Sequence, residues 1–418
     1  GGYCARFKSR RAFSFLRVWK NIFAIILALS SLVVAAEAGP PEQQEDHADD
    51  LISKGAIAPR KMLAESRYGL ARGPNGPVPA IVVDQFGYPT AAVKIAVLRD
   101  PQVGYDSFAD FAPASKLELV DVATGTVVQV GAPKPWNGGK TDPISGDRAW
   151  WFDFSMVTRA GRYVSLDAKN RVRSPEFSIG DQVYDNVLKR ALKMFFYQRA
   201  GARKSSAYAG AAWADTPSHL GPQQDGSARP WPGARSLFQP GQLQLRDLRG
   251  GWYDAGDYSK YTSWTARNIL VLLQAYEENP NAFDDDVGIP ESKNGIPDVL
   301  DEVKWGLDWL VRMQNADGSV LCVQGLASGS PPSAATGPSY YGPPTTSASL
   351  MTAAVFAYAS KIYGALGRDE LTEFADDLAK RALAAWKWAL DHPEVRYWNN
   401  DESRQPGSRG LAHGQQEL

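Results

Sequence analysis

The stretch GGWYDAGDY, residues 250–258, decides how this chain is organised. Its two carboxylates lie three residues apart, and apolar side chains at helical spacing follow them. Asp257 stands where a helix N-cap is expected. Gly256 would permit a tight turn that lets Asp254 and Asp257 face one pocket. Such a pair can activate a water for hydrolysis, or it can cap a helix and close an Asx-turn.

The composition is that of a globular protein rich in aromatic residues. Of 418 residues, 44% are hydrophobic and 22% are charged, and the formal net charge is -1. A nearly neutral chain gives no reason to expect nucleic acid or an anionic membrane as a partner. The 13 Trp, 17 Tyr and 16 Phe can fill a core, and exposed rings can stack on sugars. Cys4 and Cys322 are the only cysteines, so no disulfide framework is expected.

The first 78 residues predict export followed by a linker. Residues 6–20 are rich in Lys and Arg, residues 22–36 form an apolar run, and Ala36-Glu37-Ala38 offers small residues for cleavage. This pattern describes a secretory signal peptide over residues 1–38, with an uncleaved anchor as the alternative. We expect a secreted, extracellular or periplasmic protein without stable membrane association after cleavage. Residues 39–78 are polar and broken by Pro and Gly, which predicts a mostly disordered linker.

Residues 79–180 predict an all-β domain. Short runs of strand-forming residues, from Ala80–Val83 to Glu176–Ile179, are separated by turn signals such as Asn137-Gly138-Gly139. About seven strands over roughly a hundred residues are typical of an Ig-like β-sandwich.

Residues 181–418 predict an all-α domain, because the apolar spacing becomes helical. The expected helices cover residues 183–196, 258–278, 297–315, 347–365 and 369–391. Two long loops, residues 201–249 and 316–344, are rich in Gly, Pro and aromatic residues. Loops of this length within a compact domain usually have a function.

Several blocks in a fixed order give the chain a family resemblance. The acid stretch is followed by Ile289–Glu302, by Trp305 and Trp309, and by Asp317–Val320. Together these blocks resemble glycoside hydrolase family 9, the inverting cellulases. Val83–Tyr88 resembles the N-terminal Ig-like domain of one subgroup. The resemblance implies an (α/α)6 barrel for residues 181–418 and the activity of an endo-β-1,4-glucanase.

The resemblance also assigns roles within the acid stretch. Asp257 corresponds to the general base, and Asp254 to the group that positions the attacking water. Four aromatic residues are candidates for lining sugar subsites, although each could equally pack in the core: Trp252, Tyr253, Trp213 and Trp231. We expect a monomer whose partner is a β-glucan or a cello-oligosaccharide.

The general acid is the missing part of this interpretation. In the family it is a Glu late in the catalytic domain, and neither Glu402 nor Glu417 carries a supporting motif. The readable helices are also too few for a six-hairpin barrel. We therefore expect a C-terminally truncated chain with an incomplete barrel, without the acid and inactive. The alternatives are an exo-acting glycosidase on gluco- or chito-oligosaccharides and a non-catalytic carbohydrate-binding protein.

A calcium site is expected on the loop before the 297–315 helix. Hard oxygen ligands at short spacing on a Gly/Pro loop suit Ca2+. The candidate ligands are Glu291, Asn294, the Ile296 carbonyl and Asp298. A solvated turn that starts the helix is the alternative.

Zinc is not expected. Related sequences often carry one cysteine after the Tyr-Gln-Arg run and another in a Cys-His pair. These positions read Ala200 and Ser218-His219 here, so the thiolates that would bind zinc are absent. The lone His219 is expected on the surface or in a loop.

Overall fold

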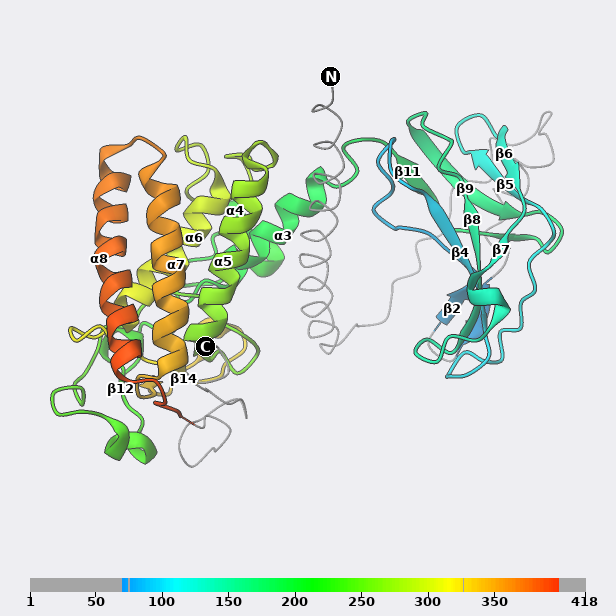
Figure 1. The fold of residues 1–418 in the computed structure, drawn as a ribbon. Coiled ribbons are helices and arrows are strands. Elements are labelled where there is room, and N and C mark those ends of the chain that lie inside the picture. The colour runs from blue at the N-terminus through cyan, green and yellow to red at the C-terminus, as the bar shows by residue number, and fades with distance from the viewer. Residues whose placement is uncertain (1–69, 74–75, 326, 398–418) are drawn as a thin grey trace, which may run out of the picture. The chain divides into compact units, whose positions relative to one another are not determined.

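The computed structural model describes residues 70–73, 76–325 and 327–397 (Figure 1). The chain divides between Lys189 and Arg190 into two compact units, which are treated separately. The predicted signal peptide, most of the predicted linker, and Glu402 and Glu417 lie outside the described residues. Within the described ranges, none of the helices is both long and apolar enough to cross a membrane.

The N-terminal unit consists mainly of antiparallel strands in two sheets. In spatial order, one sheet contains β3 (Ile81–Val82), β4 (Ile95–Pro101), β8 (Asp147–Asp153) and β7 (Lys134–Pro135). The other contains β10 (Val172–Arg173), β9 (Gly161–Asp167), β5 (Leu117–Asp121) and β6 (Val127–Gly131), and β11 (Phe177–Ile179) also pairs with β9. Every run predicted as a strand overlaps one of these, so the predicted β-rich domain is confirmed.

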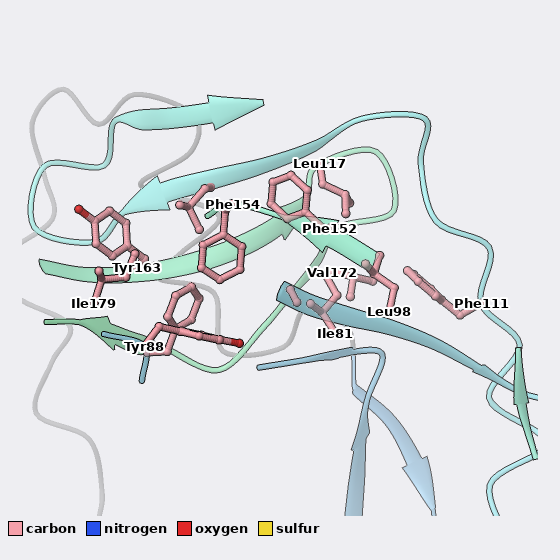
Figure 2. Close-up of a cluster of buried hydrophobic side chains, with 13 residues drawn as sticks. Ile81, Tyr88, Leu98, Phe111, Leu117, Phe152, Phe154, Tyr163, Val172 and Ile179 are labelled. Atoms are coloured by element: carbon pink, nitrogen blue, oxygen red, sulfur yellow. The ribbon is translucent and has the colours of Figure 1, made fainter. Parts of the chain in front are cut away.

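A buried cluster formed by both sheets is the core of this unit (Figure 2). Leu98 and Phe152 come from one sheet, and Leu119 and Tyr163 come from the other. Along β8, Phe152 is buried while its neighbour Trp151 is 46% exposed, since successive strand residues point to opposite faces. Burying a large apolar side chain contributes about 1.5–3 kcal/mol relative to leaving it exposed.

The predicted linker is too long at its C-terminal end. β1 (Leu70–Gly73) and β2 (Gly76–Pro79) form an antiparallel hairpin in the last part of residues 39–78. Their Pro and Gly content favours irregular structure locally, but backbone pairing between the two runs prevails.

The C-terminal unit is mostly helical. Its long helices are α5 (Thr262–Glu278), α6 (Asp298–Met313), α7 (Thr346–Gly364), α8 (Asp369–Asp391) and most of α3 (Asp185–Gln198), within which the division between the units falls. α4 (Ser206–Ala209) is a single turn. α7 packs against α5 and α8, and α5 also packs against α6, as the neighbouring ribbons in Figure 1 illustrate. The five predicted helices are present, whereas a closed (α/α)6 barrel stays a prediction.

α7 is, together with α6, one of the two most buried of these helices. The Thr345 hydroxyl caps it by accepting the Ala348 N–H at 3.2 Å. Small buried residues such as Ala353 and Ala359 allow neighbouring helices to approach. A helix that is buried on most sides belongs to the interior of its unit.

A small sheet organises the two long loops beside the acid stretch. Its strands, in spatial order, are β12 (Arg229–Pro230), β15 (Tyr340–Tyr341), β14 (Val323–Gly325) and β13 (Lys260–Tyr261). β12 comes from the first long loop, and β14 and β15 come from the second. Because β13 directly follows the acid stretch and pairs with β14, distant loops are joined to that stretch. Short 3-10 helices occupy other connections: η1 (Trp136–Gly139), η2 (Ala211–Trp213), η3 (Asp225–Ser227), η4 (Pro232–Leu237), η5 (Pro280–Ala282) and η6 (Pro332–Ala334).

The helix after the acid stretch begins later than predicted. α5 starts at Thr262 with Tyr261 at its N-cap position, so Asp257 does not cap it. The reason is that residues 260–261 pair with β14, and this long-range strand pairing overrides the local helical pattern. Asp257 Oδ1 instead accepts the Ser259 N–H at 3.2 Å, as in an Asx-turn.

Candidate active site

Asp254 and Asp257 lie on one short turn, which we call the acid loop (residues 250–259). The Asp254 N–H donates to the Ser259 carbonyl at 3.0 Å, which closes the turn around both acids. Solvent reaches both side chains. Partial desolvation by the surrounding protein, followed by the charge of Asp257, raises the pKa of Asp254 to about 6. The structure therefore brings the two predicted acids together, and at neutral pH the pair can bind and deprotonate a water.

The turn does not depend on Gly256. Its backbone is not left-handed, and a Cβ added there would meet no atom within 4 Å, so the expected role of this glycine is wrong. The residue other than glycine that is left-handed near the acids is Tyr258, with φ 57°. Gly251 is the constrained glycine, because its φ is 73° and a Cβ would lie 2.8 Å from the Trp309 ring.

A buried ion pair lies beneath the acid loop. Lys260 Nζ is 2.9 Å from Asp225 Oδ2, and both side chains are fully buried. The ammonium also donates to the carbonyls of Leu248 (3.3 Å) and Gly250 (2.7 Å), so all three of its donors are used. Asp225 Oδ1 accepts the Ser339 hydroxyl at 2.6 Å. Burial lowers the pKa of Lys260, and the Asp225 charge opposes this shift. Sequence reasoning missed this pair, because no local pattern relates positions so far apart.

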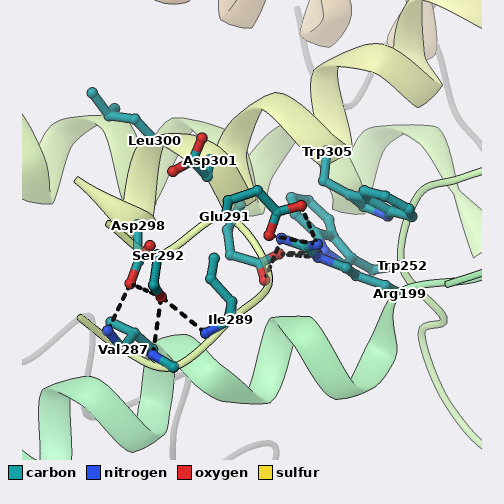
Figure 3. A network of polar contacts seen from close by, with 12 residues as sticks. Arg199, Trp252, Val287, Ile289, Glu291, Ser292, Asp298, Leu300, Asp301 and Trp305 are labelled. Carbon is teal, nitrogen blue, oxygen red and sulfur yellow. Dashed lines mark hydrogen bonds and ion pairs between the residues drawn. The ribbon is translucent and has the colours of Figure 1, made fainter. Parts of the chain in front are cut away.

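A second buried charge network holds Trp252 (Figure 3). Arg199 lies 2.9 Å from Glu302 and 2.8 Å from Glu291. The Trp252 indole N–H donates to Glu302 at 3.2 Å. Trp252 is 5% exposed and its ring packs against Gly306 of α6. Its proposed role in a sugar subsite is therefore wrong, because the indole offers no open face.

Tyr253 is also buried, at 5% exposure. Its hydroxyl lies 2.5 Å from Ser218 Oγ and 2.7 Å from His219 Nδ1. The ring faces the interior, so Tyr253 does not line a sugar subsite. His219 lies in a loop, which was one of its two expected positions, but it is not on the surface, since it is 2% exposed.

The other two aromatic candidates differ in exposure. Trp213, in η2, is 71% exposed, so its ring is open to a ligand. Trp231 is partly buried and packs edge-on against Tyr340, with ring centroids 4.8 Å apart. Of the four predicted aromatic residues, Trp213 offers the most accessible ring.

Three carboxylates that could hold a metal gather at the start of α6. Oxygens of Asp285, Asp298 and Asp301 lie within 4.8 Å of one another, and Figure 3 shows the last two. Asp298 Oδ2 accepts the Val287 N–H (2.6 Å) and the Ser292 hydroxyl (2.8 Å). Its buried Oδ1 has no hydrogen-bond partner in the described part of the chain. Mutually close carboxylates with an unpartnered buried oxygen fit a hard cation such as Ca2+.

The predicted calcium ligands coincide with this carboxylate cluster only at Asp298. Glu291 pairs with Arg199 instead. Asn294 Oδ1 accepts the Ile296 N–H at 2.7 Å, which makes a local turn. The side chains of Glu291 and Asn294, two of the predicted calcium ligands, are therefore engaged in other contacts.

Asp285 and Asp301 are the members of the cluster that sequence reasoning missed. Asp301 follows Asp298 by three residues on a helix, so a shared face could have been inferred from spacing. Asp285 comes from an acidic run in the preceding loop, and only the closure of that loop brings it close. Desolvation and the neighbouring acids raise the pKa of Asp301 to about 7.

Two known protein families match this chain, one in its C-terminal part and one in its N-terminal part. The family model for glycosyl hydrolase family 9 matches residues 184–411, more than half of the chain. The chain belongs to glycosyl hydrolase family 9. The model for the cellulase N-terminal Ig-like domain matches residues 77–170. The predicted family resemblance is thereby confirmed.

Two curated relatives of this family 9 member are enzymes. A cellulose 1,4-beta-cellobiosidase from Acetivibrio thermocellus is 28% identical over 348 residues, which are 76% of this chain and 37% of that protein. A xyloglucan-specific endo-beta-1,4-glucanase from Bacteroides ovatus is 30% identical over 353 residues, which are 81% of this chain and 54% of that protein. The chain thus spans about half or less of the length of these relatives.

Two solved structures of family 9 endoglucanases have the same fold. A metagenome-derived enzyme is similar with a TM-score of 0.66 and 32% identity, over 79% of this chain and 57% of that chain. The Zn-binding triple mutant of endoglucanase J30 is similar with a TM-score of 0.64 and 29% identity, over 77% and 56% of the two chains.

Substituting alanine for Gly251 and for Gly256 tests which of these glycines the fold of the acid loop requires. Gly251→Ala is expected to lower the free energy of unfolding by about 1–3 kcal/mol, because its Cβ overlaps the Trp309 ring. Gly256→Ala is expected to change it by less than about 1 kcal/mol, because the space is open and the backbone suits alanine. Urea unfolding followed by Trp fluorescence measures both values. Equal losses in the two variants would contradict this account.

Proposed function

We propose that this protein is an exported glycosidase that cleaves β-1,4-glucosidic bonds in cellulose or related β-glucans with inversion of configuration. Its membership of glycosyl hydrolase family 9 supports the reaction class. The observation that carries the proposal is the acid loop, where the pKa of the accessible Asp254 is raised to about 6 beside Asp257. The helices α3 to α8 are proposed to belong to an (α/α)6 barrel.

In this proposal, Asp257 is the general base and Asp254 holds the attacking water. Asp257 takes a proton as the water oxygen attacks the anomeric carbon on the face opposite the leaving sugar. The bond to the leaving oxygen breaks, and the configuration inverts. The departing oxygen needs a proton from a general acid, which we assign to none of the described carboxyl groups. The acid loop supplies the base half of the reaction.

We propose endo action, which is cleavage within glucan chains. Exo action, which releases short units from chain ends, is the second candidate. The second is favoured by the relative that is named as a cellobiosidase. The two long loops meet in the small sheet next to the acid loop, where they could close one end of a cleft. An endo-acting enzyme would yield mixed products from cellohexaose, whereas an exo-acting one would yield a single short product.

We propose that a calcium ion binds between Asp285, Asp298 and Asp301. The unpartnered Asp298 Oδ1 and the closeness of three like charges support this site. Oxygen ligands of this kind are those that Ca2+ prefers. The ion would neutralise the acids and stabilise the loop that leads into α6.

Zinc does not fit the positions that carry cysteine in related sequences. Ala200 and Ser218 offer no thiolate, and His219 Nδ1 is already hydrogen bonded to Tyr253. The related endoglucanase J30 is a zinc-binding protein in its triple-mutant form. This chain carries no sulfur ligand at either of these positions.

An activated substrate tests the acid loop separately from the general acid. The leaving group of 2,4-dinitrophenyl β-cellobioside departs without protonation, so a base and a positioned water are sufficient. The 418-residue chain is expected to hydrolyse this substrate but to show little turnover of carboxymethyl-cellulose. Asp257→Asn is expected to lower kcat on the activated substrate by about 10²- to 10⁴-fold, because the base is lost. Absorbance of the released dinitrophenolate measures the rate.

Asp376→Asn is the matched control, because Asp376 is an exposed carboxylate on α8. It is expected to keep the rate of the unsubstituted protein. An unchanged rate in Asp257→Asn would rule out the assigned base. Binding of cellohexaose without hydrolysis of either substrate would favour the carbohydrate-binding alternative.

The raised pKa of Asp254 predicts a specific pH dependence of stability. This pKa is about 6 in the folded protein and 3.8 ordinarily, so ionisation of Asp254 is disfavoured by folding. Its contribution to stability is present below about pH 4 and is lost as the pH rises through about 6. The melting temperature of Asp254→Asn, relative to the unsubstituted protein, should therefore increase across this interval. A difference that stays constant with pH would show that the pKa is not raised.

Calcium is expected to stabilise the protein through the carboxylate cluster. Near pH 7, millimolar Ca2+ should raise the melting temperature above its value in EDTA, because the ion would neutralise the cluster. Desolvation, followed by the charges of the neighbouring acids, raises the pKa of Asp301 to about 7. Asp301→Asn should lose most of this rise and should be more stable than the unsubstituted protein in EDTA. Asp308→Asn, an exposed substitution on the same helix, should keep the rise. The same calcium response in both variants would contradict the site.

A further inference from the structure

Four groups from three parts of the chain form one chain of hydrogen bonds, which we call the Tyr253 junction: Ser218, Tyr253, His219 and the Ala327 carbonyl. Tyr253 Oη is 2.5 Å from Ser218 Oγ and 2.7 Å from His219 Nδ1. His219 Nε2 is 2.8 Å from the Ala327 oxygen. The three side chains are between 2% and 5% exposed, so these hydrogen bonds are shielded from water.

The hydrogen bonds of the junction run in one consistent direction. A carbonyl oxygen only accepts, so His219 Nε2 carries a proton and donates to Ala327. In a neutral imidazole, Nδ1 then accepts from the Tyr253 hydroxyl, whose oxygen accepts from Ser218. Burial lowers the pKa of His219 and raises that of Tyr253, which keeps both groups uncharged. Every polar side chain in the junction is therefore satisfied without a cation.

The junction joins the acid loop to both long loops. Ser218 and His219 belong to residues 201–249, and Ala327 belongs to residues 316–344. Tyr253 immediately precedes Asp254, and its N–H donates to the Gln198 carbonyl at 2.9 Å. Backbone and side chain of Tyr253 are both anchored, so the direction of the following carboxylate is set.

Tyr258, which follows the two acids in sequence, belongs to the same cluster. Its ring centroid is 4.9 Å from that of Tyr253 and 5.6 Å from that of His219. Its hydroxyl donates to the Gly329 carbonyl at 2.5 Å. In sequence, Asp254 and Asp257 thus lie between two tyrosines whose rings pack on each other. The Tyr253 hydroxyl contacts the first long loop, and the Tyr258 hydroxyl contacts the second.

The positions that carry a Cys or a Cys-His pair in related sequences all contact Tyr253. Ala200 packs against its ring, and Ser218 and His219 bind its hydroxyl. A phenol at this meeting point fills the space between the three positions and supplies one donor and one acceptor. A metal coordinated from the same positions would have to displace it.

We infer that the Tyr253 junction replaces a structural zinc site: the Tyr253 hydroxyl takes the place of the metal and fixes the acid loop without it. Tyr253 is accordingly a positioning residue for Asp254. The importance of Asp254 rests on the proposed function, whereas the junction itself does not. The tests below therefore measure metal content and local order rather than hydrolysis.

The first test is the effect of removing the hydroxyl. Tyr253→Phe is expected to increase amide hydrogen exchange at residues 253–259 by about fivefold to tenfold, which corresponds to the loss of one buried hydrogen bond. Tyr363→Phe is the matched control, because it removes a buried hydroxyl that donates to Leu300 between α7 and α6. It should leave exchange in the acid loop unchanged. Equal effects of the two substitutions in the acid loop would overturn the positioning role.

The second test introduces a metal site at these positions. The variant Ala200→Cys/Ser218→Cys/Tyr253→His presents two thiolates and two imidazoles and is expected to bind one zinc per chain. Zinc should return exchange at residues 253–259 to the level of the unsubstituted protein, a rescue that Tyr253→Phe should not show. The unsubstituted chain should purify without stoichiometric zinc. One zinc per unsubstituted chain, or a folded triple variant that binds none, would overturn the inference.

Discussion

The acid loop depends on the buried ion pair between Lys260 and Asp225. Removing one partner of such a pair destabilises a protein by about 3–5 kcal/mol, because the remaining charge is left buried and unpaired. Here the desolvation of both charges is offset by additional hydrogen bonds to two carbonyls and from Ser339. The pair ties the base of the acid loop to both long loops. The backbone of the acid loop is therefore fixed, although the carboxylates of this loop face solvent.

Two further contacts hold the same loop from other directions. Trp252 is bound through Glu302 to Arg199, and Tyr253 is bound to Ser218 and His219. These consecutive side chains both point into the protein, which leaves the next residue, Asp254, to face solvent. Two buried neighbours can thus set the direction of a carboxylate without binding it. The N-terminal unit has its own apolar core and depends on none of these contacts.

The carboxylate cluster and the acid loop share a common support (Figure 3). Ser292 binds Asp298 in the cluster, and the preceding residue, Glu291, pairs with Arg199. Arg199 in turn pairs with Glu302, which binds Trp252. A cation in the proposed calcium site would therefore stabilise a segment that also holds the acid loop.

Local patterns in the chain were sufficient to predict the strands of residues 79–180, the five long helices and the position of the acid pair, because periodicity and motif order are properties of neighbouring residues. They did not reveal that Trp252, Tyr253 and His219 are buried, since the segments that cover them are distant in sequence. The start of α5 depended on pairing between β13 and β14. The carboxylate cluster depended on the closure of the loop that carries Asp285. Each of these features was decided by contacts that exist only after distant segments have come together.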